Sequence, residues 1–374
     1  MRLAIISSQA FSLHNFRGPL IRALVERGVS VFALAPDFDE TSRSAVRAYG
    51  ADPVNYSLSR AGRNPFRDLA DAIGLARCLK QIAPDLSLAY FIKPVIYGTF
   101  AAGVARVPRR FALVPGLGYV FTGVEESGSR FRRRVLRRVV SRLYAAAFSR
   151  CEKVIFQNKE DADWFASRDL IPGEKVVRIS GTGVDLTHWL PEPLAPLPPV
   201  FLLIARLLRQ KGVADFVEAA RLVKARHSDA TFLLVGGLDP NPSGHTQAEV
   251  DAWVREGLIE WAGHVGDVRS WIARSNVYVL PSYREGVPRS TQEAMAMGRP
   301  VITTDTVGCR ETVVEGVNGF LVPVRNPIAL AAAMERFIQN PDLIQSMGRE
   351  SRRLAVERFD VHKINGVILN AMGF

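Results

Sequence analysis

Two glutamates stand eight positions apart in the stretch PSYREGVPRSTQEAMAMGRPVITTD, residues 281–305. Glu285 comes just before a segment that Pro288 opens and Gly298 closes, a pattern that predicts a short helix because proline suits a first helical turn. Glu293 falls inside that helix. The start of a helix attracts anions through its free N–H groups and its dipole, so acidic side chains beside it mark a candidate ligand site.

A pair of cations gives a second candidate site. Arg206 and Lys211 lie five positions apart in ARLLRQKG, directly after the strand-like run 200–204. An arginine fork and a lysine point charge at the end of a strand suit a diphosphate group. In so basic a protein, an ordinary pair of surface side chains is the alternative interpretation.

Short β-rich runs alternate with helical segments along the whole chain, which favours an α/β fold with parallel sheets and helices on both faces. Five prolines within residues 186–199 mark a linker. We therefore predict two Rossmann-like domains, 1–188 and 200–356, with a linker at 189–199. A helix is expected at Pro19–Arg27. The loops after the strands, including Ser7–Arg17, are expected to face a cleft between the domains and to hold the ligand.

Composition narrows the class of protein. The chain has 374 residues, 48% of them hydrophobic, and no apolar run approaches the ~20 residues of a membrane-spanning helix. Three cysteines without CxxC spacing predict a reduced, cytosolic setting without disulfides or zinc. The first loop lacks GxGxxG, so an NAD enzyme is not expected, although Asp37 follows the second strand-like run. The Asp37–Asp39 pair reads as a loop pair, and neither a metal nor another cofactor is expected.

The net charge of +11 is concentrated in RFRRRVLRRVVSR, residues 130–142, which holds seven arginines. Apolar residues recur every four positions from Phe131 to Ala147, so this segment predicts an amphipathic helix with a basic face. Three interpretations remain open: a core-packed helix with a solvated basic face, a helix on an anionic membrane surface, and a nucleic-acid contact.

ARLLRQKG and REGVPRSTQE, in this order and spacing, resemble the retaining glycosyltransferases of family 4. The segments VGG (235–237), GHVGDV (263–268), GCRE (308–311) and VEGVNGFLVP (314–323) extend the resemblance over essentially the whole chain. It implies the GT-B fold, in which two Rossmann-like parallel-sheet domains face each other across a cleft. It also implies that residues 357–374 form a helix that crosses back to the N-terminal domain.

For the donor site, the resemblance implies a nucleotide-sugar, in most members a UDP-sugar, although the residues do not exclude GDP. Arg206 and Lys211 would bind its diphosphate and neutralise the leaving group. Glu285 would hold a hydroxyl of the donor sugar near the reacting carbon, and Glu293 would accept hydrogen bonds from the ribose. The helix start would add contacts to the phosphates through Gly286, Val287 and Pro288. A neighbouring turn would hold the base through Gly237, His264 and Val265.

SLHNFRGPLIRAL (12–24), FIKPVIYG (91–98) and VPGLGYVF (114–121) resemble the branch of the family that extends sugars on undecaprenyl diphosphate, such as its N-acetylgalactosaminyltransferases. Arg17 and Lys93 are then candidates for the acceptor diphosphate, with ordinary loop cations as the alternative. The full set of acceptor candidates is His14, Asn15, Arg17, Lys93, Gly116, Gly118 and Tyr119. The candidates for membrane contact are Arg132, Arg133, Arg134, Arg137 and Arg138.

Together these features predict a retaining transferase that moves a sugar, an N-acetylhexosamine, from a UDP-sugar to a polyprenyl-diphosphate-linked saccharide in bacterial surface-glycan or glycoprotein-glycan assembly. It would act at the cytoplasmic face of the membrane, with no nucleic-acid partner. No residue is identified as a catalytic base; in a front-face mechanism the leaving phosphate takes the acceptor proton. The alternatives are a GT-B UDP-sugar 2-epimerase and a non-catalytic basic protein that binds membranes or nucleic acid.

Overall fold

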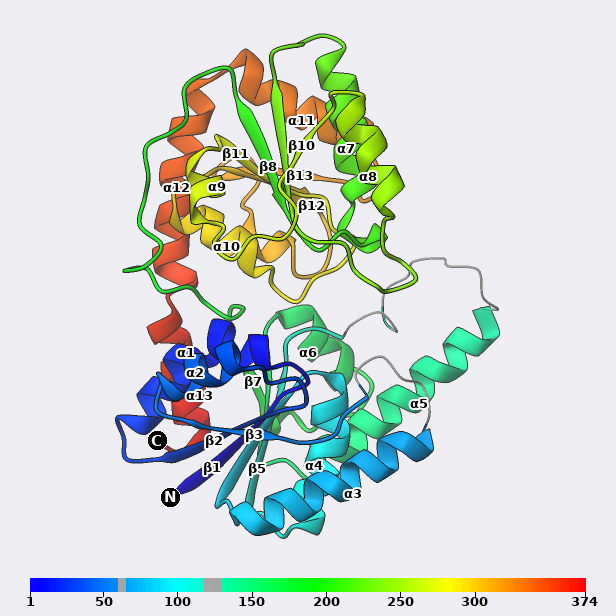
Figure 1. Ribbon diagram of the computed structural model, residues 1–374, viewed down its shortest axis with the longest axis vertical. Helices are drawn as coiled ribbons and strands as arrows, with labels where there is room; N and C mark the ends of the chain where they lie inside the picture. The colour runs from blue at the N-terminus through cyan, green and yellow to red at the C-terminus, as the bar shows by residue number, and fades with distance from the viewer. Residues whose placement is uncertain (60–64, 118–120, 122–129) are drawn as a thin grey trace. The chain divides into compact units, whose positions relative to one another are not determined.

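The computed structural model of the protein describes residues 1–59, 65–117, 121 and 130–374 (Figure 1). The chain forms two compact units. The N-terminal unit runs to Thr182 and takes back the final segment His362–Phe374, while the C-terminal unit contains Gly183–Val361. Each unit is a parallel β-sheet with helices packed against it, as the alternation of strand-like and helical segments predicts.

The N-terminal sheet has seven parallel strands in the order β3-β2-β1-β4-β5-β6-β7. Of its central strands, β4 is buried along its whole length and β1 in all but its first residue, which is typical of parallel sheets covered on both faces. The strands are β1 (Arg2–Ile6), β2 (Ser30–Ala35), β3 (Asp52–Asn55), β4 (Leu86–Tyr90), β5 (Arg109–Val114), β6 (Lys153–Phe156) and β7 (Val176–Arg178). The helices are α1 (Ala10–Val25), α2 (Glu40–Arg47), α3 (Pro65–Ile82), η1 (Pro94–Gly98), α4 (Thr99–Val104), α5 (Arg130–Phe148), α6 (Lys159–Ala166) and η3 (Gly173–Lys175).

Helix α1 begins nine residues earlier than the predicted start at Pro19, so the predicted loop Ser7–Arg17 is wrong over most of its length. Pro19, the first residue of the predicted helix, lies inside α1. The helix is stabilised from its inner face, where Leu13 and Leu20 are fully buried. At its start, the backbone N–H of Ala10 donates to Asp37 at 2.7 Å.

The C-terminal sheet has six parallel strands in the order β10-β9-β8-β11-β12-β13. Its strands are β8 (Val200–Ile204), β9 (Thr231–Val235), β10 (Glu260–Trp261), β11 (Val277–Leu280), β12 (Val301–Thr304) and β13 (Gly319–Val322). Its helices are η4 (Arg209–Lys211), α7 (Val213–Lys224), α8 (Gln247–Arg255), α9 (Arg269–Ala273), α10 (Arg289–Ala296), η5 (Arg310–Thr312), α11 (Pro327–Gln339) and α12 (Asp342–Arg358).

The proline-rich segment expected to be a linker at 189–199 belongs to the C-terminal unit, because the change of unit falls at Thr182. Arg299 is only 1% exposed, and its guanidinium donates to the carbonyls of Glu192 and Pro193 at 2.8 and 2.9 Å. The side chain of Asn276 donates to the carbonyl of Ala195 at 2.8 Å. The prolines predict a segment without regular secondary structure. The hydrogen bonds to Arg299 and Asn276 attach this segment to the C-terminal unit.

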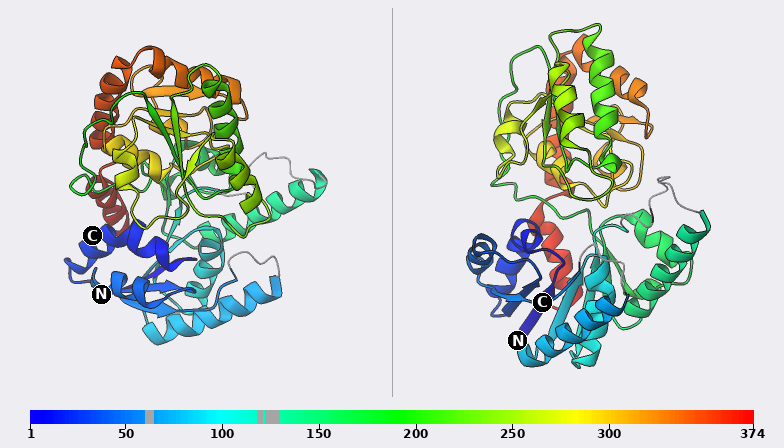
Figure 2. Two further views of the ribbon diagram at one scale, coloured as in Figure 1. Left: turned by 45° about the horizontal axis from the view of Figure 1, so that its top comes forward. Right: turned by 45° about the vertical axis from the view of Figure 1, so that its right-hand side comes forward.

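The last helix, α13 (Val361–Met372), packs in the core of the N-terminal unit. Ile364, Ile368 and Met372 are buried there together with residues of β1 and β4. Figure 2 shows this final helix, drawn in red, beside the blue N-terminal elements. Among the described residues, no helix has the length and apolar character needed to cross a membrane.

Candidate active site

The predicted donor motifs come together at the carboxyl ends of the C-terminal strands. The loop after β8 bonds the loop after β9 through the N–H of Leu207 and the carbonyl of Gly237, at 3.1 Å. The loop after β11 bonds the loop after β12 through the N–H of Glu285 and the carbonyl of Val307, also at 3.1 Å. Ligands of open parallel sheets bind at this edge, so four segments remote in sequence form one candidate site.

Lys211 and Glu285, predicted from separate motifs, form an ion pair with 2.5 Å between Nζ and Oε1. Their side chains are 22% and 13% exposed. Gly212 follows Lys211 with a φ of 70°, and a Cβ there would lie 2.1 Å from the carbonyl oxygen of Pro281. Only glycine permits this close approach, which brings the cation beside the loop that carries the carboxylate.

Arg206 has a partner that the sequence analysis missed. Its Nη1 lies 2.7 Å from Oδ2 of Asp239, which follows β9. The arginine side chain is 56% exposed, whereas Asp239 is largely buried and its other oxygen accepts the N–H of Asn241 at 2.9 Å. No motif signals Asp239, because the two side chains meet only when the loops after β8 and β9 lie side by side.

Helix α10 starts beside Glu285, with Pro288 as its N-cap residue rather than a member of the first turn. The preceding turn is fixed from two sides. The side chain of Gln292 donates to the carbonyl of Val287 at 3.2 Å, and a Cβ on Gly308 would lie 2.1 Å from the carbonyl oxygen of Gly286. The GCRE segment therefore contributes a close backbone contact that positions the start of α10.

Glu293, the candidate ribose ligand, is paired with Arg289 one turn earlier in α10, with 2.8 Å between Nε and Oε1. Burial raises the pKa of Glu293, and the positive charge of Arg289 partly offsets this rise. Arg289 also donates to the carbonyl of Gly183 at 3.1 Å. Arg289 is not among the residues predicted from the sequence, although its spacing of four residues from Glu293 on a helix is a usable signal.

The candidate base-binding residues lie at neighbouring turns. A Cβ on Gly236 would lie 1.8 Å from the carbonyl oxygen of Ala205, so a side chain is not tolerated at the end of β9. A Cβ on Gly237 would lie 3.3 Å from the Cβ of His264. His264 is exposed, whereas Val265 packs partly against the core. The geometry leaves the His264 ring open to solvent beside the glycine turn.

The candidate acceptor residues differ more from expectation. His14, Asn15 and Arg17 lie on helix α1 rather than on a loop. Arg17 is 2% exposed, and its guanidinium carbon lies 5.2 Å from the centre of the Tyr90 ring, so it is not an ordinary loop cation. Burial lowers the pKa of His14.

Lys93 immediately precedes η1, so the predicted loop at this place is helical. Its Nζ lies 2.6 Å from Oδ1 of Asp68 and donates to the carbonyl of Ser59 at the same distance. An adjacent carboxylate neutralises the charge that an acceptor diphosphate would need. Gly116 follows β5, and the other two candidates, Gly118 and Tyr119, lie outside the described residues.

The arginine-rich helix α5 is core-packed only in its second half. There Tyr144, Ala147 and Phe148 are buried. In the first half the apolar residues Phe131 and Val139 are exposed, as are Arg134, Arg137 and Arg138. The side chains of Arg132 and Arg133 lie outside the described part of the chain.

The Asp37–Asp39 pair contributes to helix starts. Asp37 accepts the N–H of Ala10, and Asp39 caps α2 by accepting the N–H of Ser42 at 2.8 Å. No group of three His, Cys, Asp or Glu side chains among the described residues has the arrangement to hold a metal ion.

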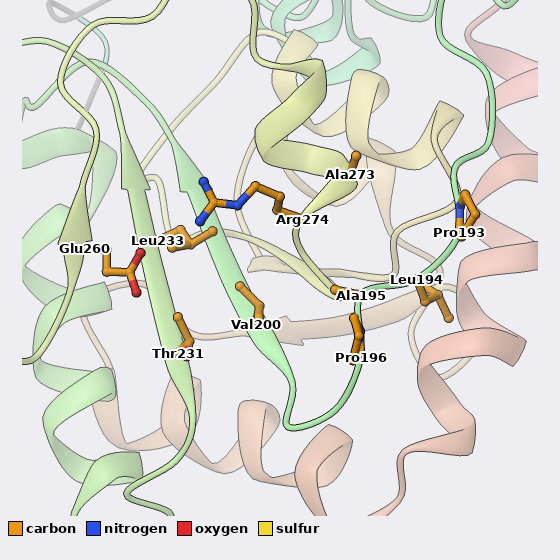
Figure 3. Close-up of a pocket in the computed structure, with 10 residues that line it drawn as sticks. All are labelled: Pro193, Leu194, Ala195, Pro196, Val200, Thr231, Leu233, Glu260, Ala273 and Arg274. Carbon is orange, nitrogen blue, oxygen red and sulfur yellow. The ribbon is translucent and has the colours of Figure 1, made fainter.

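A cavity lies away from these loops (Figure 3). It has a volume of about 430 Å³ and is bordered by Val200 and Thr231, the first residues of β8 and β9. Glu260 and Arg274 are its charged lining residues. It therefore lies at the opposite end of the strands from the paired cations and carboxylates.

Two Rossmann-like parallel sheets, one with carboxylates and cations at its strand ends, agree with the GT-B fold expected from the sequence. A model described as "Glycosyl transferases group 1" matches residues 198–340, and one described as "Glycosyltransferase Family 4" matches residues 19–188. The chain belongs to glycosyltransferase family 4.

Two relatives are similar to the chain over most of its length. The chain is 30% identical to the Campylobacter jejuni N,N'-diacetylbacillosaminyl-diphospho-undecaprenol alpha-1,3-N-acetylgalactosaminyltransferase, over 96% of this chain and 94% of that protein. It is 25% identical to the Escherichia coli UDP-Gal:alpha-D-GlcNAc-diphosphoundecaprenol alpha-1,3-galactosyltransferase, over 80% of this chain and 77% of that one. Anabaena HepE in complex with UDP and glucose has the same fold, with a TM-score of 0.75 at 18% identity over 100% of this chain and 99% of HepE.

Proposed function

We propose that the protein transfers a sugar from a UDP-sugar, with retention of anomeric configuration, to a saccharide linked to polyprenyl diphosphate. The observation that carries the donor part is the meeting of Lys211 with Glu285 at the strand ends. The names of the two relatives support an undecaprenyl-diphosphate acceptor, and the C. jejuni name supports an N-acetylhexosamine as the sugar.

In this proposal the paired side chains exchange partners when the donor binds. Arg206 and Lys211 move their hydrogen bonds toward the diphosphate and stabilise the negative charge that grows as UDP leaves. Glu285 is released to accept a hydrogen bond from a donor-sugar hydroxyl, and Glu293 accepts from the ribose. The leaving phosphate takes the acceptor proton, so the mechanism needs no side-chain base.

We further propose that the protein acts at the cytoplasmic face of the membrane and that it works without a resident metal or other cofactor. The exposed arginines in the first half of α5 support contact with an anionic membrane surface. Arg17 and Lys93 both remain candidates for the acceptor diphosphate, and Lys93 would have to exchange its carboxylate partner Asp68 for the phosphate.

The test begins with titration calorimetry of UDP, GDP and NAD against the wild type and Arg206→Ala. Selective UDP binding that weakens in the variant supports the donor site, and GDP selectivity moves the donor to a GDP-sugar. Transfer is then measured by mass spectrometry with UDP-sugars and a polyprenyl-linked acceptor, and the anomeric configuration of the product by NMR. Release of free sugar without an acceptor would indicate the 2-epimerase instead, and no nucleotide binding would leave the non-catalytic basic protein.

A further inference from the structure

Helix α3 exposes an apolar stripe that the sequence analysis did not single out. Phe66, Leu69 and Ile73 are 82%, 58% and 47% exposed, at spacings of three and four residues that place them on one side of the helix. Ala70 on the same side is also exposed. Grouped exposed apolar side chains on a folded unit mark an interaction surface, whereas isolated ones need no explanation.

The acidic residues of α3 both point away from this stripe. Asp68 is bound to Lys93 at 2.6 Å. Asp71 accepts the hydroxyl of Ser57 and the N–H of Ser59, at 2.5 and 2.9 Å. Both aspartates are buried, so every exposed charge on α3 is positive: Arg67, Arg77 and Lys80.

The first half of α5 has the same combination of properties. Phe131, Val135 and Val139 are exposed, and the helix sequence contains no Asp or Glu. Helices α3 and α5 both contact η1. Figures 1 and 2 show them on the same flank of the N-terminal unit, with α4 between them. We define the exposed faces of α3 and of the first half of α5 as the two-helix surface.

We infer that the two-helix surface inserts its apolar side chains into the headgroup region of an anionic bilayer, with α3 supplying an apolar contact that does not depend on charge. Apolar stripes flanked only by positive charge are the pattern of helices that lie in a membrane interface. A protein partner would bring carboxylates to pair these cations, but it gives no reason why the exposed faces of both helices carry no acidic side chain. The inference rests on the proposed lipid-linked acceptor and deepens it, because η1, which follows Lys93, then lies between two lipid-facing helices.

The inference is tested by flotation of the full-length protein with vesicles of phosphatidylglycerol and phosphatidylethanolamine, at low and high salt. The stripe variant is Leu69→Ser with Ile73→Ser, and the charge variant is Arg134→Gln with Arg137→Gln and Arg138→Gln. The matched control is Ile328→Ser on α11, which removes an apolar side chain that is 72% exposed in the other unit. Thermal unfolding of each variant confirms that it is folded.

For the wild type, we expect binding that salt weakens but does not abolish. The stripe variant should lose the salt-resistant part, with a partition coefficient about tenfold lower, because burying even part of two aliphatic side chains is worth roughly that factor. The charge variant should lose the salt-sensitive part, since screening acts on exposed charges. The control should bind like the wild type.

Two results would overturn the inference. The first is a folded stripe variant that binds vesicles as well as the control does. The second is a wild-type dimer in solution that the stripe substitutions dissociate, because the surface would then be covered by a second copy of the chain. UDP binding is measured in parallel, so a failed donor site is distinguished from a failed membrane surface.

Discussion

Replacing Glu285 with glutamine should separate nucleotide binding from sugar transfer. Lys211 is paired with Glu285, and both side chains are mostly buried. A diphosphate that binds Lys211 must compete with this carboxylate. Glutamine keeps the size of the side chain but removes its negative charge, so Lys211 becomes a stronger anion ligand.

The size of the effect follows from the strength of the pair. Exposed ion pairs contribute about 0.2–1 kcal/mol, and this pair is more buried than those, so we take about 1 kcal/mol as the competition that is relieved. That energy corresponds to roughly fivefold tighter binding of free UDP in Glu285→Gln. Transfer should fall, by about 100-fold or more in kcat, because in the proposed mechanism the carboxylate holds the donor sugar in the transition state.

The assay combines titration calorimetry with UDP and steady-state transfer with the UDP-sugar, and Lys211→Ala is the companion variant. Lys211→Ala should weaken UDP binding by about tenfold or more, since it removes a charge-assisted contact. Weaker UDP binding in Glu285→Gln, with its thermal stability intact, would refute the competition between carboxylate and diphosphate. Unchanged kcat would refute the role of Glu285 at the donor sugar.

Three further variants test the supporting contacts. If Asp239 acts by positioning Arg206, Asp239→Ala should change the Kd for UDP in the wild type but not in Arg206→Ala, and additive effects in this double-mutant cycle would contradict the coupling. Gly212→Ala should lower the free energy of unfolding by about 1–3 kcal/mol in urea titrations. The reason is that alanine must adopt a positive φ here and its Cβ meets a backbone oxygen. An unchanged urea midpoint would show that the close approach is not required. Asp68→Ala should lower the free energy of unfolding by about 3 kcal/mol, since it leaves the largely buried Lys93 without its carboxylate. A loss no larger than that caused by replacing an exposed aspartate would argue against a structural ion pair.

Local patterns in the sequence predicted much of the molecule. The alternation of strands and helices determined the α/β class, because hydrophobic periodicity and turn residues act over a few residues. The motifs around Arg206, Lys211, Glu285 and Glu293 predicted which residues meet at the strand ends, and the ion pair of Lys211 with Glu285 agrees with that grouping. Even the missed partner Arg289 was available locally, since it stands one helical turn before Glu293.

Other features were decided by tertiary packing. Pro19 suggested a helix start, but buried contacts of Leu13 and Leu20 extend α1 well before it, since packing outweighs a local preference. The proline-rich segment is fixed by Arg299, more than 100 residues later in the chain.

The sequence by itself determined the fold class and the family resemblance and predicted the donor residues, because each depends on residue types at short or regular spacing. Tertiary structure decided which charges are already paired, as for Asp239 with Arg206 and Asp68 with Lys93, and which apolar faces stay exposed on α3 and α5. The physical reason is that pairing and burial depend on neighbours brought together by the sheet, and spacing along the chain carries no record of them.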